Sequence, residues 1–183
     1  MDATDEQLVE RYRHGDEQAF VTLVDRYMVH LYHFVRQFVS DPAGAEDIVQ
    51  ETFVKTWQSL PRFKMEKRFK TWIFTIAKNT TYDFLKKKKT LPFSLFENSQ
   101  GENVLENTIS GDEQPDDVLD RESTALELEA KLRLLAPEYQ TLLRLRYQQD
   151  LTLQEIAALL EVPYNTIKSK HTRALAQLKK TFL

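Results

Sequence analysis

The sequence predicts an all-α protein with two small helical domains joined by a flexible acidic linker. The 183 residues include only four glycines and six prolines, fewer than a strand-and-turn protein needs. Apolar residues recur at helical spacing on both sides of a polar central segment, and we find no alternating strand pattern of useful length. A chain of this length accommodates one medium domain or two small ones, and the polar central segment favours two.

Charge is unevenly distributed along the chain. The net charge is −3, but residues 1–89 carry +2, residues 90–123 carry −8 and residues 124–183 carry +3. The overall balance therefore says little about the partners of the two basic blocks, which flank a strongly acidic one.

Composition also argues against several kinds of chemistry. Cysteine is absent, which excludes disulfides, thiolate metal sites and thiol nucleophiles. Because there is no convergent His/Asp/Ser set, metal-ligand spacing or glycine-rich loop, we expect no enzyme, catalytic residue, metal, cofactor or small-molecule substrate. The polar N-terminal stretch is unlike a signal peptide, and no apolar run approaches the roughly 20 residues of a membrane span. We therefore expect a cytoplasmic protein.

The predicted first domain, residues 1–90, opens with two long amphipathic helices. One has an apolar stripe from Phe20 to Phe38, and Asp41 and Pro42 end it. The next spans residues 43–59. Its expected core face carries Ile48, Val49, Phe53 and Trp57. Its opposite face carries Asp47, Gln50, Glu51, Val54 and Gln58. That face could dock a protein, but its spacing alone favours an ordinary solvated surface.

A third helix, predicted over residues 67–85, separates into two faces on a helical wheel. The face expected in the core carries Phe69, Trp72, Ile73, Ile76, Ala77 and Phe84. The face expected at the surface carries Lys70, Phe74, Thr75, Lys78, Asn79 and Tyr82. Aromatics among cations are typical of surfaces that bind single-stranded nucleic acid, and Arg62 to Lys89 carry a net charge of +8. Partner-helix binding stays open; a membrane-surface helix is disfavoured because its large apolar residues are needed for packing.

The linker is predicted over residues 91–123. It has sparse apolar residues, glycines in polar surroundings and no sustained period, which is the composition of a flexible segment. As a coil it would average roughly 30 Å from end to end. Fully extended it could reach roughly 110 Å.

The second domain, residues 124–183, is predicted to contain four helices. A helix from Leu126 to Leu135 precedes one that starts at Pro137 and runs to Tyr147. Thr152 and Glu155 then form a capping box ahead of a short apolar helix. A turn at residues 161–163 leads into a last helix from Asn165 to Lys180. Two short helices joined by a tight turn form a helix-turn-helix pattern.

The last helix has one apolar and one polar, basic face. Ile167, His171, Ala174, Leu175 and Leu178 share the apolar side, where we expect His171 in the core or at its rim. Lys168, Ser169, Thr172, Arg173 and Lys180 share the other. Mixed polar side chains beside cations are what a helix in the DNA major groove needs, because polar groups read base edges and charge binds phosphates. The alternative is a structural hairpin with a solvated face.

Three motifs occur together in a fixed order. AEDIVQETFVKTW (45–57) precedes F-x5-F-x-TW-x3-IA-x-N (63–79), and LTLQEIAALLEVPYNTIKSKHTRAL (151–175) follows the acidic segment. In these motifs and their order the chain resembles an extracytoplasmic-function (ECF, group 4) sigma factor of bacterial RNA polymerase, with a sigma-2 helical bundle before the linker and a sigma-4 helix-turn-helix domain after it. The resemblance implies a non-catalytic subunit that binds core polymerase, recognises the −35 and −10 promoter elements and promotes DNA opening.

The resemblance also implies partners. These are the β′ clamp coiled coil and the β flap of core RNA polymerase, promoter DNA, and an anti-sigma factor that could hold the protein at the membrane. A stand-alone helix-turn-helix regulator, which would bind duplex DNA without polymerase, is the alternative function.

Residue roles follow from the resemblance as well. The polymerase-binding set is Asp47, Gln50, Glu51 and Val54. The set implied for the −10 element is Phe63, Lys64, Lys67, Arg68, Lys70, Phe74, Lys78, Asn79 and Tyr82. The set implied for the −35 element is Lys168, Ser169, Thr172 and Arg173. The chain departs from the family pattern at Glu161, where glycine is usual, and at Lys168, where arginine is frequent.

Overall fold

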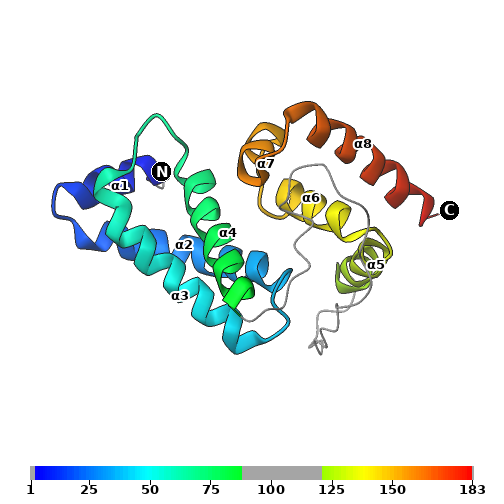
Figure 1. The fold of residues 1–183 in the computed structure, drawn as a ribbon, viewed down its shortest axis with the longest axis horizontal. Coiled ribbons are helices and arrows are strands. Elements are labelled where there is room, and N and C mark those ends of the chain that lie inside the picture. Colours follow the sequence, from blue (N-terminus) through cyan, green and yellow to red (C-terminus); the bar gives the residue numbers. More distant parts are fainter. Residues whose placement is uncertain (1–2, 88–120, 183) are drawn as a thin grey trace. The chain divides into compact units, whose positions relative to one another are not determined.

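The computed structural model describes residues 3–87 and 121–182, with side chains left out over 121–126. The chain divides into two compact units. Within the described ranges every regular element is a helix, as Figure 1 shows. This confirms the prediction of an all-α chain with two helical domains. The predicted flexible linker lies almost wholly outside the described residues.

Over residues 3–87 the first unit contains four α-helices and one short 3-10 turn. They are α1 (Asp5–Arg13), α2 (Glu17–Arg36), α3 (Pro42–Ser59), η1 (Leu60–Arg62) and α4 (Phe69–Lys87). Helix α1 was not predicted. It begins with a reciprocal capping box, in which Thr4 Oγ1 accepts from the Gln7 amide at 3.2 Å and Gln7 Oε1 accepts from the Thr4 amide at 2.9 Å. It buries only Leu8 and Val9, too few residues to form a periodic stripe.

Helix α4 packs against all three of the other α-helices of this unit, α1, α2 and α3. The largest fully buried side chains include Phe34 of α2 and Phe69 and Phe74 of α4. The rings of Phe34 and Phe74 meet edge to face, with centroids 5.3 Å apart. Tyr27 of α2 approaches Phe69 in the same way at 5.6 Å. An aromatic core therefore joins α2 to α4.

Threonines of α3 and α4 are buried in the core of this unit. Thr52 and Thr56 of α3 are fully buried, as is Thr81 of α4. Each hydroxyl donates to the carbonyl four residues earlier, at 2.7 Å from Thr52 and 2.8 Å from the other two. Because these hydroxyls are satisfied within their own helices, the small side chains can be buried without an unpaired polar group.

Over residues 121–182 the second unit contains four helices. They are α5 (Arg121–Arg133), α6 (Pro137–Tyr147), α7 (Leu153–Leu160) and α8 (Tyr164–Lys180). Helix α5 begins five residues before the predicted start at Leu126, inside the predicted linker. Its first turn is polar and offers no apolar periodicity that a sequence reading could follow.

One hydrophobic cluster of this unit combines residues of α5, α6 and α8 with Leu135, which follows α5, while Ile156 and Leu159 of α7 are also fully buried. The cluster contains Leu132, Leu135, Tyr139, Leu143 and Ala174, with Leu178 packed against it. The predicted capping box of α7 is confirmed: the Glu155 amide donates to Thr152 Oγ1 at 3.2 Å, and the Thr152 amide donates to Glu155 Oε2 at 2.8 Å. Glu161, the residue that caps the C-terminal end of α7, adopts the left-handed conformation with φ of 57°. This reverses the chain into α8 and completes the predicted helix-turn-helix.

In the part of the chain that the structure describes, none of the helices combines the length and the apolarity that spanning a membrane would require.

Candidate nucleic-acid and protein interfaces

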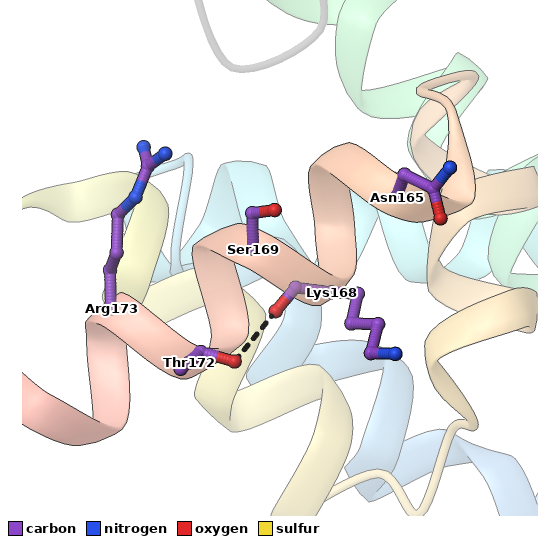
Figure 2. A pocket seen from close by; sticks show the side chains of 5 residues that line it. All are labelled: Asn165, Lys168, Ser169, Thr172 and Arg173. Carbon is purple, nitrogen blue, oxygen red and sulfur yellow. Dashed lines mark hydrogen bonds between the residues drawn. The ribbon is translucent and has the colours of Figure 1, made fainter.

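The outer face of α8 carries a continuous set of polar and cationic side chains. A surface hollow is lined by Asn165, Lys168, Ser169, Thr172 and Arg173. Figure 2 shows these side chains projecting from the helix, with the charged ends of Lys168 and Arg173 extending away from the backbone. The opposite face is buried through Ile167 and Ala174. The four residues predicted to contact the −35 element therefore share one exposed face, to which the structure adds Asn165.

Two contacts with α6 fix how α8 presents this face. Lys170 Nζ lies 2.7 Å from Glu138 Oε2, so this lysine is engaged with α6. Tyr147 Oη lies 3.1 Å from Nε2 of His171, which is half-buried at the rim of the core, as predicted. Burial of the ring, and then the nearby Arg146 guanidinium, lower the pKa of His171. The imidazole is thereby favoured in its neutral form, which can accept a hydrogen bond from the tyrosine hydroxyl.

Helix α4 corrects two of the −10 predictions. The wheel placed Phe74 and Lys78 on the exposed face, but Phe74 is fully buried and Lys78 is 7% exposed. The buried stripe is rotated by roughly 70–80° from the predicted one at 100° per residue. The physical reason is that Thr81 is buried on that side, where a wheel based on apolar residues treats it as polar surface. Phe74 accordingly packs on Phe34, away from solvent.

The loop before α4 is exposed between two buried aromatic residues. All five residues from Lys64 to Arg68 are exposed, whereas Phe63 is 5% exposed and Phe69 is 0% exposed. The ring centroids of these two lie 5.8 Å apart, and Trp72 packs against Phe63 in a tilted arrangement, with centroids 4.8 Å apart. Phe63 was predicted to contact DNA, but its side chain is instead buried against Phe69 and Trp72.

The remaining residues predicted for the −10 element stay at the surface. Asn79 is exposed on α4, and Lys70 and Tyr82 are half-buried. Lys64, Lys67 and Arg68 belong to the exposed loop. A basic loop and a polar strip of α4 are therefore accessible, whereas the side chains of Phe63, Phe74 and Lys78 are buried.

Helix α3 presents the predicted polymerase-binding face to solvent. Asp47, Gln50, Glu51 and Val54 are all exposed, and Val54 keeps 50% of its surface. Trp57 was predicted in the core but is 51% exposed. It lies three residues beyond Val54, on the same side of the helix. The cause is again threonine: Thr52 and Thr56 take the centre of the buried face and turn Trp57 outward.

The fold and these surfaces define a two-domain helical protein whose second domain has the features of a DNA-binding helix-turn-helix. Two protein-family models match the chain. They are sigma-70 region 2, over residues 23–90, and sigma-70 region 4, over residues 125–178. The two matches fall on the first and second units respectively.

Curated proteins match over almost the whole length. The ECF RNA polymerase sigma factor SigW of Bacillus subtilis is 28% identical over 174 residues, covering 94% of this chain and 93% of that protein. The ECF RNA polymerase sigma-E factor of Haemophilus influenzae is 30% identical over 174 residues, covering 93% and 91%. The chain therefore belongs to the ECF family of RNA polymerase sigma factors, proteins that regulate transcription initiation.

Solved structures share the fold. The structure of CnrH in complex with the cytosolic domain of CnrY has a TM-score of 0.63 at 22% identity, covering 97% of this chain and 96% of that chain. The structure of the sigma factor RpoE with the anti-sigma factor NepR from Bartonella quintana has a TM-score of 0.59 at 24% identity, covering 88% and 94%.

Proposed function

We propose a separate role for each domain of this RNA polymerase sigma factor. Residues 1–90 form a sigma-2 domain that binds core polymerase and captures the −10 element. Residues 91–123 link it to a sigma-4 domain, residues 124–183, that reads the −35 element. The observation that carries the proposal is the exposed polar and cationic face of α8, which follows the tight turn of a helix-turn-helix.

The outer face of α8 suits duplex DNA. Arg173 can donate two parallel hydrogen bonds to a guanine edge, whereas Lys168 supplies a point charge for a base acceptor or a phosphate. Thr172 Oγ1 donates to the Lys168 carbonyl at 3.1 Å, which leaves its lone pairs to accept from a base. Asn165 lies in the first turn of α8, where backbone amides favour a phosphate.

The loop and the exposed strip of α4 suit a single strand with an unstacked base. Lys64, Lys67 and Arg68 supply positive charge for the backbone, and Asn79 supplies an amide that can read a base edge. Flipping a base costs a few kcal/mol of stacking and pairing, which a pocket has to offset. Phe63, Phe74 and Lys78 support this surface from within and do not contact DNA.

The exposed face of α3 suits a protein partner, and we assign it to the β′ clamp coiled coil. Val54 and Trp57 provide an apolar centre, with Asp47 and Glu51 as a charged rim. The second unit is assigned to the β flap. In this role the protein is a specificity subunit without catalysis of its own.

Transcription with purified components tests the proposed function. Core polymerase plus this protein is expected to select, from a randomised promoter library, templates that share two elements about 17 base pairs apart, which is roughly 58 Å of duplex. The protein alone is expected to bind core tightly and duplex promoter weakly. Tight, selective duplex binding without core, and no stimulated transcription, would favour the stand-alone regulator instead.

An anti-sigma factor is proposed as a further partner. The similar CnrH and RpoE structures contain the cytosolic domain of CnrY and the anti-sigma factor NepR respectively. We place this protein in the cytoplasm, where such a partner could sequester it or hold it at the membrane. Affinity purification from its native cell tests this. Recovery of core polymerase alone, under inducing and non-inducing conditions, would contradict it.

A further inference from the structure

Helix α1 forms hydrogen bonds with both ends of the loop that precedes α4. At the start of the loop, Arg13 Nη2 donates to the carbonyls of Leu60 at 3.1 Å and Pro61 at 3.2 Å, and also to that of Phe63. At the end, Glu6 Oε1 accepts from the Phe69 amide at 3.2 Å. The exposed residues 64–68 therefore lie between two polar anchors that come from one helix.

The chemistry of each anchor matches the end that it holds. The carbonyls around η1 belong to a helix terminus, which carries partial negative charge, and the guanidinium of Arg13 offers several donors to them. Phe69 begins α4, and its amide lies at the positive end of that helix, where the carboxylate of Glu6 is stabilising. Reversing either charge would oppose its helix dipole.

Helix α1 is itself fixed well enough to act as a rigid support. Asp5 pairs with Arg26 of α2 and accepts a hydrogen bond from the buried Tyr27 hydroxyl. Leu8 and Val9 are 2% and 0% exposed. Glu6 and Arg13 lie seven residues apart, almost two full turns, so both face the loop from the same side of α1.

We propose that Glu6 and Arg13 are positioning residues for −10 recognition: they hold residues 64–68 in the shape that receives the unstacked base. The inference deepens the proposed function and rests on it. A preorganised loop loses less conformational freedom when it binds DNA, so promoter opening is favoured without a direct contact from α1. The buried side chains of Phe63 and Phe69 fix the position of the loop, and the hydrogen bonds from α1 fix the backbone path at its two ends.

The test compares holoenzymes made with Glu6→Ala and Arg13→Ala with two matched controls. Arg11→Ala removes an arginine of α1 that pairs with Asp16, and Glu10→Ala removes an exposed acid of the same helix. Templates are those that the wild-type holoenzyme selects from a randomised library. Each anchor variant is expected to slow open-complex formation about tenfold and to flatten base preference within the −10 element, the size expected for losing a charge-assisted hydrogen bond.

Three further readouts separate positioning from folding. Affinity for core polymerase and base preference at −35 are expected to stay at wild-type values. In the free protein, amide hydrogen exchange at Lys67, whose amide bonds the Lys64 carbonyl at 3.0 Å, is expected to speed up about tenfold in the anchor variants alone. Arg13→Lys, which supplies a point charge in place of the fork, is expected to fall between wild type and Arg13→Ala in opening rate.

Two results would overturn the inference: anchor variants that open promoters and choose −10 bases like the controls, or a loss of core affinity that matches the loss of opening. If Arg13→Ala fails to fold, Arg13→Lys decides by the same criteria. A wild-type holoenzyme without any −10 preference, but with normal loop protection that the anchor variants lose, would overturn the proposed function and leave the structural role of α1 standing.

Discussion

Helices α4 and α8 were both predicted to carry a DNA-binding face, but the exposure of the predicted residues differs between the two helices. Every predicted contact on α8 is exposed, with Ile167 and Ala174 buried opposite. On α4 the predicted face is divided, because Phe74 and Lys78 are buried while Asn79 is exposed. The difference follows from packing: α8 packs against α6 and α7, whereas α4 packs against α1, α2 and α3. A helical wheel therefore predicts the exposed face more reliably for a helix that packs against its neighbours on one side only.

Replacing Phe74 gives the largest expected effect, because it asks whether this residue of α4 is core or contact. Phe74→Ala is expected to lower the free energy of unfolding by about 3–5 kcal/mol, as for other buried phenylalanines. Urea denaturation of the full chain, followed by a probe in the first unit, measures this. Asn79→Ala on the same helix is the control, with unchanged stability expected. A stable Phe74→Ala variant that loses only −10 affinity would restore the wheel's assignment.

On α8 the expected effects are on DNA and not on folding. Lys168→Ala or Arg173→Ala should each reduce discrimination of the −35 sequence by about 1–3 kcal/mol, with the effect of Arg173 confined to one base position. Holoenzyme transcription from templates with single substitutions at −35 measures it. Lys179→Ala, in the last turn of the same helix, should leave selectivity intact. Equal losses from all three would indicate general phosphate attraction instead of readout.

Trp57 of α3 extends the comparison to a protein interface. Trp57→Ala should weaken core polymerase binding about tenfold or more, as for aromatic residues central to an interface, and cost little folding stability because half of its surface is exposed. Phe53→Ala, a buried aromatic of the same helix, should do the reverse and destabilise the first unit. Fluorescence titration against core polymerase and thermal unfolding measure the two effects. Full core affinity in Trp57→Ala would return this residue to a structural role.

The sequence predicted most of the helices and four of the five residues that line the exposed face of α8, because capping boxes, prolines and a one-sided apolar stripe are local signals. It missed α1, whose contribution is polar and long-range: Glu6 and Arg13 contact residues about fifty or sixty positions later. It misplaced Trp57 and Phe74 because threonines that bond their own helix backbone can occupy core positions. Hydroxyl satisfaction of this kind depends on the helix already being formed, so the residue type alone does not reveal it.

A substitution in the turn of the helix-turn-helix, just before α8, is expected to have a smaller effect on stability. Glu161 adopts a φ of 57°, a conformation that glycine adopts without the steric cost of a side chain. Glu161→Gly should therefore raise the stability of the second unit by about 0.5–1 kcal/mol. Thermal unfolding measures the gain, and unchanged −35 selectivity would show that α8 keeps its position. Glu161→Ala keeps the left-handed backbone and should show no such gain; an equal gain would rule out relief of strain as the cause.

The smallest expected effect is a pH dependence at the base of α8. Burial and Arg146 lower the pKa of His171, so the folded state binds a proton less readily than the unfolded chain, whose histidine pKa is about 6.5. Its contribution to stability is therefore fully present above that value and is lost as pH falls below it through the lower pKa of the folded state, where the partly buried ring beside Arg146 takes up a proton. Solvent reaches much of the ring, which keeps the loss small.

Unfolding of the second unit at pH 7.5 and 5.5 should thus show a modest loss of stability on acidification. His171→Gln, which keeps a polar partner for Tyr147 but does not titrate, should remove that part of the pH dependence. His14→Gln, in the exposed C-cap of α1, is the matched control and should leave it unchanged. If acidification stabilised the second unit, or if His171→Gln behaved like His14→Gln, the contact between α6 and α8 would not be what disfavours the charged imidazole.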